Sequence, residues 1–342
     1  MIGIALIGAG RIGQIRARVI SEVKPAELVA VADANIAAAE RVASPVRAKS
    51  FSDWRECISA PGVDAVIVAT PTMLHAEIAS AALAAGKHVL CEKPLARNVA
   101  EAERIVDAAR ASSKVLKTGF NYRHLPHVRK AKELIAGGEL GELSFLRCHF
   151  GHGGRPGFEK EWHTDPEISG GGALLEQGIH VMDLIRYLLG EPVRVAGQRS
   201  TFFWNLRDVE DNCFCLFETK AGQIAQVHVS WTQWINSFQL ELYGQDGYLK
   251  LQGRDGHYGP PVIRWAKRNS DHSRPCEQHI EFESGDDWRE EWKEFLAAIA
   301  EQRAPLGSGR DGLRAQRMIE TAYESSAVGR WVAIAEDEDA QP

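Results

Sequence analysis

The sequence has few of the features that mark secreted, membrane or nucleic-acid-binding proteins. Six cysteines in 342 residues are too few for a disulfide framework, and no apolar run approaches the ~18 residues that span a bilayer. Lysine and arginine number 40 against 46 aspartate and glutamate, a formal charge of −6. There is thus no basic excess to bind nucleic acid or an anionic membrane. The first residues lack the basic region of a signal peptide, so we expect a soluble protein of the reducing cytoplasm.

Residues 1–120 alternate short apolar strands with alanine-rich helices. Near-continuous apolar strands between helices are typical of a parallel sheet that is covered on both faces. The predicted strands are Ile2–Ile7, Leu28–Asp33, Ala65–Thr70, His88–Cys91 and Val115–Thr118, and the predicted helices are Ile12–Glu22, Ile36–Val42, Leu74–Ala85 and Val99–Ala111. The pattern therefore predicts a doubly wound α/β domain in the first third of the chain.

The pattern changes after residue 120, where strands follow strands. Such runs favour an antiparallel or mixed open sheet that packs one face on helices. The predicted strands are Leu143–Gly151, Val195–Trp204, Asn212–Glu218, Gln223–Trp231 and Phe238–Tyr243, and the predicted helices are Val128–Ala136, Gly172–Leu189, Trp288–Gln302 and Asp311–Val328. We expect domains at 1–120 and 121–334, and a disordered acidic tail at 335–342.

A glycine-rich turn follows the first predicted strand. Gly8, Gly10 and Gly13 form a GxGxxG pattern between this strand and the first helix, where such a turn holds the pyrophosphate of a dinucleotide at a helix N-terminus. The first glycine permits the tight turn, the second lets the backbone approach the pyrophosphate, and the third lets helix and strand pack closely. The candidate cofactor-binding residues of this turn are Gly8, Gly10, Arg11, Ile12 and Gly13.

A carboxylate follows the second predicted strand at the spacing of a ribose ligand. Asp33 lies twenty residues after Gly13, as does the acidic residue that binds the adenosine ribose of a dinucleotide. Its charge accepts a hydrogen bond from a 2′-hydroxyl and repels a 2′-phosphate, which favours NAD over NADP. Arg11 leaves NADP open, because its side chain is either a solvated charge or a partner for a 2′-phosphate.

The next predicted strand ends in polar residues. In an open parallel sheet, ligands gather at the carboxyl ends of the strands, so Thr70, Pro71 and Thr72 are candidates for cofactor binding. His75 follows at the start of a helix, where it either binds the cofactor or serves the fold.

The sequence Glu92-Lys93-Pro94 follows the fourth predicted strand and places a lysine on the cofactor edge. An ammonium group beside an alcohol stabilises a developing alkoxide and orients its oxygen. A surface lysine is the alternative, since most lysines are solvent-exposed. The following proline and the position at a strand end favour the functional interpretation, with Glu92 and Lys93 beside the cofactor.

Three glycines, Gly170 to Gly172, open a helix that carries a second group of titratable residues. Glu176 and His180 are four residues apart and Asp183 follows three residues later, spacings that share one face of a helix. Histidine is the natural proton carrier near neutral pH, and a carboxylate one turn away orients it or shares its proton. The glycines would let a ligand approach the helix N-terminus. Purely structural roles are the alternative.

Together these motifs resemble the Gfo/Idh/MocA family, which includes glucose–fructose oxidoreductase, inositol dehydrogenase and many sugar dehydrogenases. The resemblance is carried by GxGxxG with its distal Asp, ATPT with the following His, EKP, and GGG-x3-E-x3-H-xx-D, and it runs from residue 2 to about 330. It implies an N-terminal Rossmann domain and a C-terminal α/β domain with an open, mostly antiparallel sheet. It also implies a homodimer or homotetramer, often formed through this sheet.

By position, Lys93 matches the family lysine that contacts the substrate hydroxyl and the nicotinamide, and His180 matches the catalytic histidine. Glu176 stands where inositol dehydrogenase-like members usually carry Asp, so its carboxylate reaches one methylene further. The family segment that enters the second domain along the substrate pocket is matched by Asn121, Tyr122 and Arg123.

A loop of glycine, aromatic and charged residues precedes the triple glycine. Trp162 is suited to stacking on a sugar face, and Arg155, Lys160 and His163 are suited to binding hydroxyls or an anion. These cations leave open a uronic acid, a sugar phosphate or a nucleotide sugar, and an ordinary surface loop is the alternative. Nearby histidine pairs lack the close cysteine pair of a zinc site, so we expect no metal.

We therefore predict an NAD-dependent dehydrogenase that acts on a secondary alcohol of a cyclitol or pyranose, with Lys93, His180 and Glu176 as catalytic residues. We expect no nucleic-acid or membrane partner. An NAD-dependent glycosidase remains an alternative: it would oxidise the sugar transiently, eliminate the aglycone and reduce the product again, with the same residues. A sugar or dinucleotide sensor is a third possibility, although it would tolerate loss of the lysine and histidine that are both present.

Overall fold

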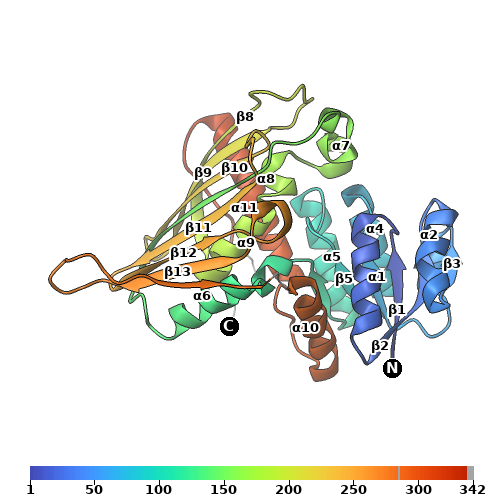
Figure 1. Ribbon diagram of the computed structural model, residues 1–342. Helices are drawn as coiled ribbons and strands as arrows, with labels where there is room; N and C mark the ends of the chain where they lie inside the picture. The colour runs from blue at the N-terminus through green and yellow to red at the C-terminus, as the bar shows by residue number, and fades with distance from the viewer. Residues whose placement is uncertain (284–285, 337–342) are drawn as a thin grey trace. The chain divides into compact units, whose positions relative to one another are not determined.

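The computed structural model describes residues 1–283 and 286–336, which form two compact units (Figure 1). The first unit contains residues 1–121, 167–170 and 288–316, and the second contains 122–166, 171–287 and the chain from residue 317. This division differs from the predicted domains at 1–120 and 121–334, because two later segments belong to the first unit. Of the predicted acidic tail, Ala335 and Glu336 have no regular structure, and 337–342 lie outside the described residues.

Six parallel strands form the sheet of the first unit. The strands are β1 (Ile2–Ile7), β2 (Ala26–Ala32), β3 (Lys49–Phe51), β4 (Ala65–Val68), β5 (His88–Cys91) and β6 (Leu116–Thr118). Their order across the sheet, β3-β2-β1-β4-β5-β6, is that of doubly wound dinucleotide-binding domains. The helices are α1 (Arg11–Glu22), α2 (Ile36–Ala43), α3 (Trp54–Ile58), α4 (His75–Ala84), α5 (Val99–Ser112) and α10 (Asp287–Glu301). The predicted elements are confirmed to within two residues at each end, whereas β3 and α3 are too short to show a clear period.

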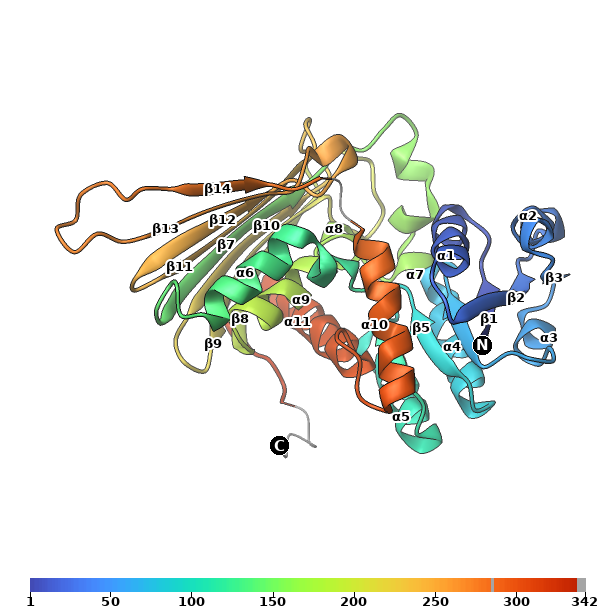
Figure 2. The same cartoon turned by 60° about the horizontal axis from the view of Figure 1, so that its bottom comes forward.

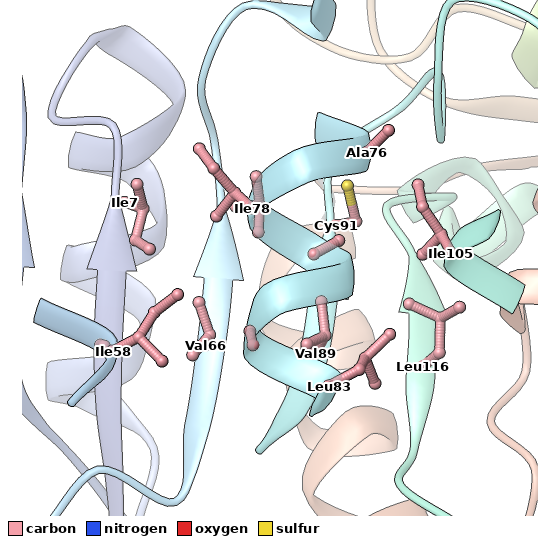
Figure 3. Close-up of a cluster of buried hydrophobic side chains, with 14 of the residues drawn as sticks. Ile7, Ile58, Val66, Ala76, Ile78, Leu83, Val89, Cys91, Ile105 and Leu116 are labelled. Carbon is pink, nitrogen blue, oxygen red and sulfur yellow. The ribbon is translucent and has the colours of Figure 1, made fainter. Parts of the chain in front are cut away.

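Side chains alternate between the two faces of this sheet, and both faces are buried. In β1, Ala5 and Ile7 belong to the core under α3, α4 and α5, which Figure 3 shows in close-up. Ile4 and Leu6 belong to the core under α1 and α2. Burial on both faces is the reason that the strands read as continuous apolar runs.

Helix α10 completes the second of these cores, although it is far from the other elements in the sequence. Trp292 and Phe295 are 1% and 0% exposed and pack in the same cluster as Leu6 and Ile67. Burial of a large apolar side chain stabilises a fold by about 1.5–3 kcal/mol. The two aromatic rings therefore explain why residues 288–316 belong to the first unit.

The second unit is built on a nine-stranded sheet. The strands are β7 (Leu143–Gly151), β8 (Pro192–Ser200), β9 (Asn212–Thr219), β10 (Ile224–Ser230), β11 (Ser237–Gly244), β12 (Gly247–Gln252), β13 (Val262–Lys267), β14 (Gln278–Glu281) and β15 (Val332–Ala333). Their order is β14-β13-β12-β11-β7-β10-β9-β8-β15. Strands β7 and β10 are parallel and the other neighbours are antiparallel, so the sheet is mixed and mostly antiparallel, as predicted.

Helices cover one face of this sheet (Figure 2). They include α6 (Pro126–Ala136), α8 (Ala173–Glu176) and α9 (Ile179–Leu188), while α7 (Pro166–Ser169) and α11 (Gly309–Val328) each contribute residues to both units. On the opposite face, Phe214 and Leu216 are 43% and 41% exposed. Within the described residues, no helix has the length and apolar character needed to cross a membrane.

Two predicted elements of the second unit differ from the structure. The helix predicted at 172–189 is broken between α8 and α9 at Gln177 and Gly178, and only a glycine fits at the break, since a Cβ on Gly178 would lie 2.5 Å from the carbonyl oxygen of Leu174. The strand predicted at 195–204 ends at Ser200. There the Asp211 carboxylate accepts the N–H groups of residues 202–204 and turns them out of the ladder.

Candidate active site

Three neighbouring strands of the first unit end in the predicted cofactor residues. Strand β1 leads into the glycine turn, β4 into Thr70, and β5 into Lys93. Because β1, β4 and β5 are adjacent and parallel, these three segments lie at one edge of the sheet, where doubly wound proteins bind their ligands.

The three glycines of the turn have different surroundings. Gly8 has a φ of +97°, and a Cβ there would lie 2.3 Å from the carbonyl oxygen of Ala69. A Cβ on Gly13 would lie 1.9 Å from the carbonyl oxygen of Gly8. At Gly10, no atom of the described chain lies within 4 Å of the Cβ position. Gly8 and Gly13 thus serve the packing of strand, turn and helix, whereas the backbone at Gly10 is open at the N-terminus of α1.

Asp33 lies against the glycine turn. Its Oδ2 accepts the N–H of Ala9 at 2.8 Å, and its Oδ1 accepts the N–H of Asn35 at 2.9 Å. A carboxylate oxygen has a second lone pair, so both oxygens retain the capacity to accept a hydroxyl. The carboxylate that sequence spacing predicted for the ribose is therefore beside the turn in space.

The end of β4 combines a candidate ligand-binding hydroxyl with a structural histidine. Thr70 Oγ1 is buried and has no hydrogen-bond partner within the described part of the chain, which fits a polar ligand at this edge. Thr72 is buried and Pro71 is exposed. His75 is 1% exposed, and its Nδ1 and Nε2 each lie 2.9 Å from a backbone carbonyl oxygen, of Pro94 and Thr70 respectively. The geometry supports the structural alternative for His75.

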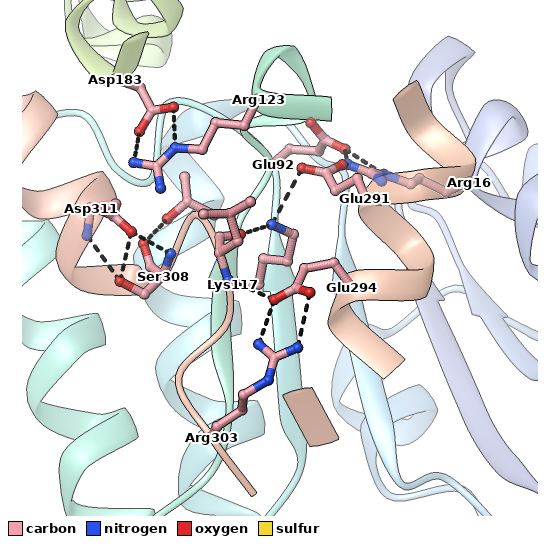
Figure 4. A network of polar contacts seen from close by, with 12 residues as sticks. Arg16, Glu92, Lys117, Arg123, Asp183, Glu291, Glu294, Arg303, Ser308 and Asp311 are labelled. Carbon is pink, nitrogen blue, oxygen red and sulfur yellow. Dashed lines mark hydrogen bonds and ion pairs between the residues drawn. The ribbon is translucent and has the colours of Figure 1, made fainter. Parts of the chain in front are cut away.

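Lys93 is half-buried and sits between two anchored neighbours. Glu92 is 7% exposed, and its Oε1 accepts a hydrogen bond from Arg16 Nε at 2.7 Å (Figure 4). On the other side, the Pro94 carbonyl lies against His75. Glu92 was predicted to bind the cofactor, and its carboxylate points to Arg16 on α1.

His180, the predicted proton carrier, is packed against an aromatic ring in the second unit. It is 6% exposed, and its imidazole stacks on the ring of Tyr122 with centroids 3.9 Å apart and planes 8° apart. Tyr122 is 4% exposed, and burial raises the pKa of its hydroxyl. A predicted pocket residue is thus a packing partner of the histidine. Glu176 is half-buried at the end of α8, and the break after it removes the continuous helix on which the predicted shared face depended.

Asp183 is engaged by an arginine. Arg123 donates to Asp183 from Nε at 2.8 Å and from a terminal nitrogen at 2.5 Å, and both side chains are buried (Figure 4). This two-point pair is a strong, directional interaction. Asp183 was predicted to orient His180, and Arg123 was predicted to line the substrate pocket. In the structure these two side chains bind each other. Asn121 of the same segment is 4% exposed.

The triple glycine is packed against protein rather than open to a ligand. A Cβ on Gly172 would lie 2.2 Å from the carbonyl oxygen of Glu210, and one on Gly171 would lie 2.8 Å from the Tyr323 hydroxyl. Glu210 also accepts the N–H of Leu174 at 2.8 Å and holds the start of α8. The absence of side chains at Gly171 and Gly172 therefore serves close packing within the protein.

The predicted substrate loop contains an ion-paired group and an exposed indole. Glu161 pairs with Arg155 and lies 3.3 Å from His163 Nε2. The His163 ring packs 4.8 Å from that of Phe158, whereas Trp162 is 43% exposed. Arg155 and His163 thus share one carboxylate, which reduces the net positive charge that this loop offers to an anion.

His152, to which the sequence assigned no role in binding, belongs to the same loop. The N–H of Gly154 donates to its Nδ1 at 3.0 Å, so the neutral ring carries its proton on Nε2. Burial, with the charges of His163, Arg155 and Arg254, lowers the pKa of His152 to about 4. At neutral pH this side chain is an uncharged hydrogen-bond donor. No group of three His, Cys, Asp or Glu residues in the described ranges is arranged to hold a metal.

Two buried charges in the first unit are not among the residues predicted from sequence. Arg16 on α1 and Glu291 on α10 are 1% and 0% exposed, with Arg16 nitrogen 2.7 Å from Glu291 Oε2. Each lies on the buried face of its helix, Arg16 with Val19 and Glu291 with Phe295. In each helix the charged residue stands where the helical period of the sequence places an apolar residue, and this pattern could have identified both.

Comparison with known proteins agrees with this geometry. Residues 2–120 match the oxidoreductase family with an NAD-binding Rossmann fold, and residues 128–250 match the GFO/IDH/MocA C-terminal domain. Glucose-6-phosphate 3-dehydrogenase of Bacillus subtilis is 30% identical over 95% of this chain and 96% of its own. Inositol 2-dehydrogenase of Rhizobium meliloti is 30% identical over 96% and 98%.

Solved structures show the same architecture over nearly the whole chain. A levoglucosan dehydrogenase in complex with NADH and levoglucosan has a TM-score of 0.90 and 28% identity, covering 98% of this chain and 100% of its own. The open backbone at Gly10, the carboxylate at the turn and the orphaned Thr70 hydroxyl fit a dinucleotide of this kind. The chain therefore belongs to the Gfo/Idh/MocA family and is an NAD-binding oxidoreductase.

Proposed function

We propose that the protein is a dehydrogenase that oxidises a secondary hydroxyl of a cyclitol or pyranose sugar with NAD. The observation that carries this proposal is the position of Lys93 at the carboxyl end of β5, on the same sheet edge as the glycine turn after β1. An ammonium group at the cofactor edge is suited to stabilise an oxygen that loses its proton as the neighbouring carbon loses hydride. The named relatives act on a sugar phosphate, an inositol and an anhydrosugar, which supports the substrate class.

Bound nicotinamide would supply the hydride acceptor. In the oxidative direction the carbinol carbon gives up a hydride and its hydroxyl oxygen gives up a proton, so that a ketone and NADH form. We assign Lys93 Nζ to donate a hydrogen bond to that oxygen and an imidazole nitrogen of His180 to accept its proton. Glu176 assists His180 by stabilising the imidazolium. General acid–base help of this kind contributes about 10²–10⁴-fold to the rate.

The loop at 151–165 supplies candidate contacts to the remaining hydroxyls. His152 offers an N–H donor on Nε2, and the exposed face of Trp162 is suited to pack on a pyranose ring. Because Glu161 already pairs with Arg155, we expect hydroxyl recognition to dominate over recognition of a strongly charged group.

We also propose that copies of the chain associate through the uncovered face of the nine-stranded sheet. Phe214 and Leu216 are exposed there, and the rings of Phe145 and Tyr243 stack 4.7 Å apart on the same face. Apolar and aromatic groups on one sheet face favour a subunit interface. Light scattering of Leu216→Glu would show a smaller particle than the unsubstituted protein, and an unchanged mass would contradict this interface.

The test of function is NADH formation from NAD, followed by absorbance over a panel of inositols, aldoses, uronic acids and aryl glycosides. NADH formation with one cyclitol or sugar supports the dehydrogenase and identifies the substrate class. Release of phenol from an aryl glycoside without net NADH would support the glycosidase instead. If no compound gives NADH or phenol, although NADH binds, the proposed oxidation of free cyclitols and pyranoses is contradicted, and a nucleotide-linked or keto substrate, or a sensor, is favoured instead.

A further inference from the structure

Four charged side chains are buried together in the first unit. Arg16, Glu92, Lys117 and Glu291 are 1%, 7%, 0% and 0% exposed. One terminal nitrogen of Arg16 lies 2.6 Å from Glu92 Oε1 and 2.7 Å from Glu291 Oε2, and Lys117 Nζ lies 3.8 Å from Glu291 Oε1 (Figure 4). Two cations and two carboxylates balance one another, as buried charges must.

The cluster joins the cofactor helix to the lysine loop through a segment from late in the chain. Arg16 lies on α1, three residues after Gly13, and Glu92 immediately precedes Lys93. Glu291 comes from α10. The guanidinium also lies 4.5 Å from the ring centroid of Trp288 at the start of α10, so that α10 contacts Arg16 by both charge and ring.

Glu291 and Glu92 both contact the same terminal nitrogen of the Arg16 guanidinium. One terminal nitrogen of Arg16 bridges the two carboxylates, while Nε of the same arginine donates to Glu92 at 2.7 Å. Burial raises the pKa of Glu291, and Arg16 and Lys117 oppose that change. Removal of the Glu291 charge would leave Glu92 as the one carboxylate bound to Arg16 and the Trp288 ring as its contact with α10, so that the guanidinium could turn away from its present position.

The backbone just before Lys93 is tied to the sheet, and the Glu92 side chain adds a tie from this loop to α1. The N–H of Glu92 donates to the Val68 carbonyl at 2.9 Å, and the N–H of Gly119 donates to the Cys91 carbonyl at 2.8 Å. With these bonds in place, the Glu92 side chain is the link between the loop and α1.

We propose that Glu291 is a positioning residue for Lys93: acting through Arg16 and Glu92, it sets the place of the Lys93 ammonium relative to the N-terminus of the cofactor helix. The inference rests on the proposed function for the role of Lys93, but the placement itself is a property of the folded chain. A misplacement of about 1 Å in a catalytic group costs on the order of 10²-fold in rate, which is the reason for so rigid a support.

The test compares Glu291→Gln with Glu294→Gln. Glu294 lies one turn further on α10 and pairs with Arg303 at 2.6 Å, so its variant also removes a carboxylate from an arginine but touches neither Arg16 nor Glu92. Each holoenzyme, saturated with NADH, is trace-labelled with acetic anhydride. Mass spectrometry then gives the rate at Lys93 relative to half-buried Lys87 in the same digest.

We expect Glu291→Gln to change the relative labelling rate of Lys93 by about threefold or more, because the loop gains local freedom, and Glu294→Gln to leave it unchanged. With a substrate, kcat of Glu291→Gln falls by about tenfold or more, while the Kd for NADH stays within about threefold. Equal labelling of Lys93 in the two variants would overturn the proposal, whatever their melting temperatures. If Glu291→Gln does not fold, Arg16→Lys replaces it, since lysine keeps the charge but not the two-carboxylate bridge.

The labelling result decides the inference even where no substrate is turned over. Absence of turnover in the unsubstituted protein would count against the proposed function, whereas an altered Lys93 rate in the same series would still support the positioning role.

Discussion

The two units hold their candidate functional residues by different means. In the first unit, the glycine turn, Thr70 and Lys93 lie at the ends of adjacent strands, and backbone contacts such as that of Gly13 with Gly8 fix them. In the second unit, His180 and His152 lie on a short helix and a loop, and aromatic side chains hold them. The candidate cofactor residues are thus placed by sheet topology, to which the buried charge cluster beside Lys93 adds, whereas the candidate residues of the second unit are placed by side-chain packing. We therefore expect the second set to vary more with the substrate.

The largest effect is expected from the two groups assigned to the chemistry, one in each unit. Lys93→Ala and His180→Ala should each lower kcat by at least about a hundredfold, because each removes a group that acts on the reacting oxygen. Steady-state kinetics and NADH fluorescence measure turnover and binding separately. Lys87→Ala serves as a control, and near-normal turnover in either test variant would remove that residue from the mechanism.

A pair of glycine substitutions separates binding from packing within the first unit. Gly13→Ala should lower the free energy of unfolding by about 1–3 kcal/mol, because its Cβ would lie 1.9 Å from the Gly8 carbonyl oxygen. Gly10→Ala meets no described atom within 4 Å, so its stability should be unchanged while NADH affinity falls by about tenfold. Thermal unfolding and fluorescence titration check both. Equal affinity loss in the two variants would contradict this division of roles.

The packing that holds His180 can be broken in a graded way. Tyr122→Leu removes the ring that stacks on the imidazole and should reduce kcat by about tenfold, whereas Tyr122→Phe keeps the ring and should retain most of the activity. Phe238→Leu is the matched control, since Phe238 packs on Tyr122 at 5.7 Å in the same cluster. A loss in Phe238→Leu as large as that in Tyr122→Leu would mean that general packing, and not the stack, matters.

The smallest expected effect is the dependence of stability on pH that comes from a buried histidine of the second unit. Burial lowers the pKa of His127 from 6.5 to about 4, so this residue stabilises the fold fully above pH 6.5 and loses that contribution as the pH falls toward 4. Between pH 7 and pH 6 the expected loss is about 1 kcal/mol or less. Melting temperatures of the unsubstituted protein and of His127→Leu, measured at both pH values, test it: the variant should depend less on pH, and an equal slope would contradict the assignment.

Local spacing made the cofactor side predictable from sequence. The GxGxxG pattern, Asp33 and the lysine after β5 depend on the order of residues around strand ends, and the sheet order then brings them to one edge. The triple glycine shows the limit of such reasoning. Its position was visible, but its reason is close approach to Glu210 and Tyr323, which are distant in the sequence.

The rest of the site depends on contacts that no local pattern contains. Arg123 binds Asp183, which lies 60 residues later in the sequence. Arg16 binds Glu291, which is separated from it by a still longer stretch of sequence. The break between Glu176 and His180 is an intermediate case, because Gly178 within a helical pattern is a recognisable signal for an interruption. Charges on the apolar faces of α1 and α10 were likewise visible, although their partners were not.

The return of α10 to the first unit has a consequence for synthesis of the protein. A ribosome that has reached residue 121 has made every strand of the first sheet, but not Trp292 and Phe295, which cover part of one face. At roughly 5–20 residues per second, the missing helix follows after on the order of ten seconds or more. During that interval the nascent sheet presents an apolar surface to which chaperones can bind. A gene cut at the predicted boundary would make this state permanent, giving an aggregation-prone fragment in place of a cofactor domain.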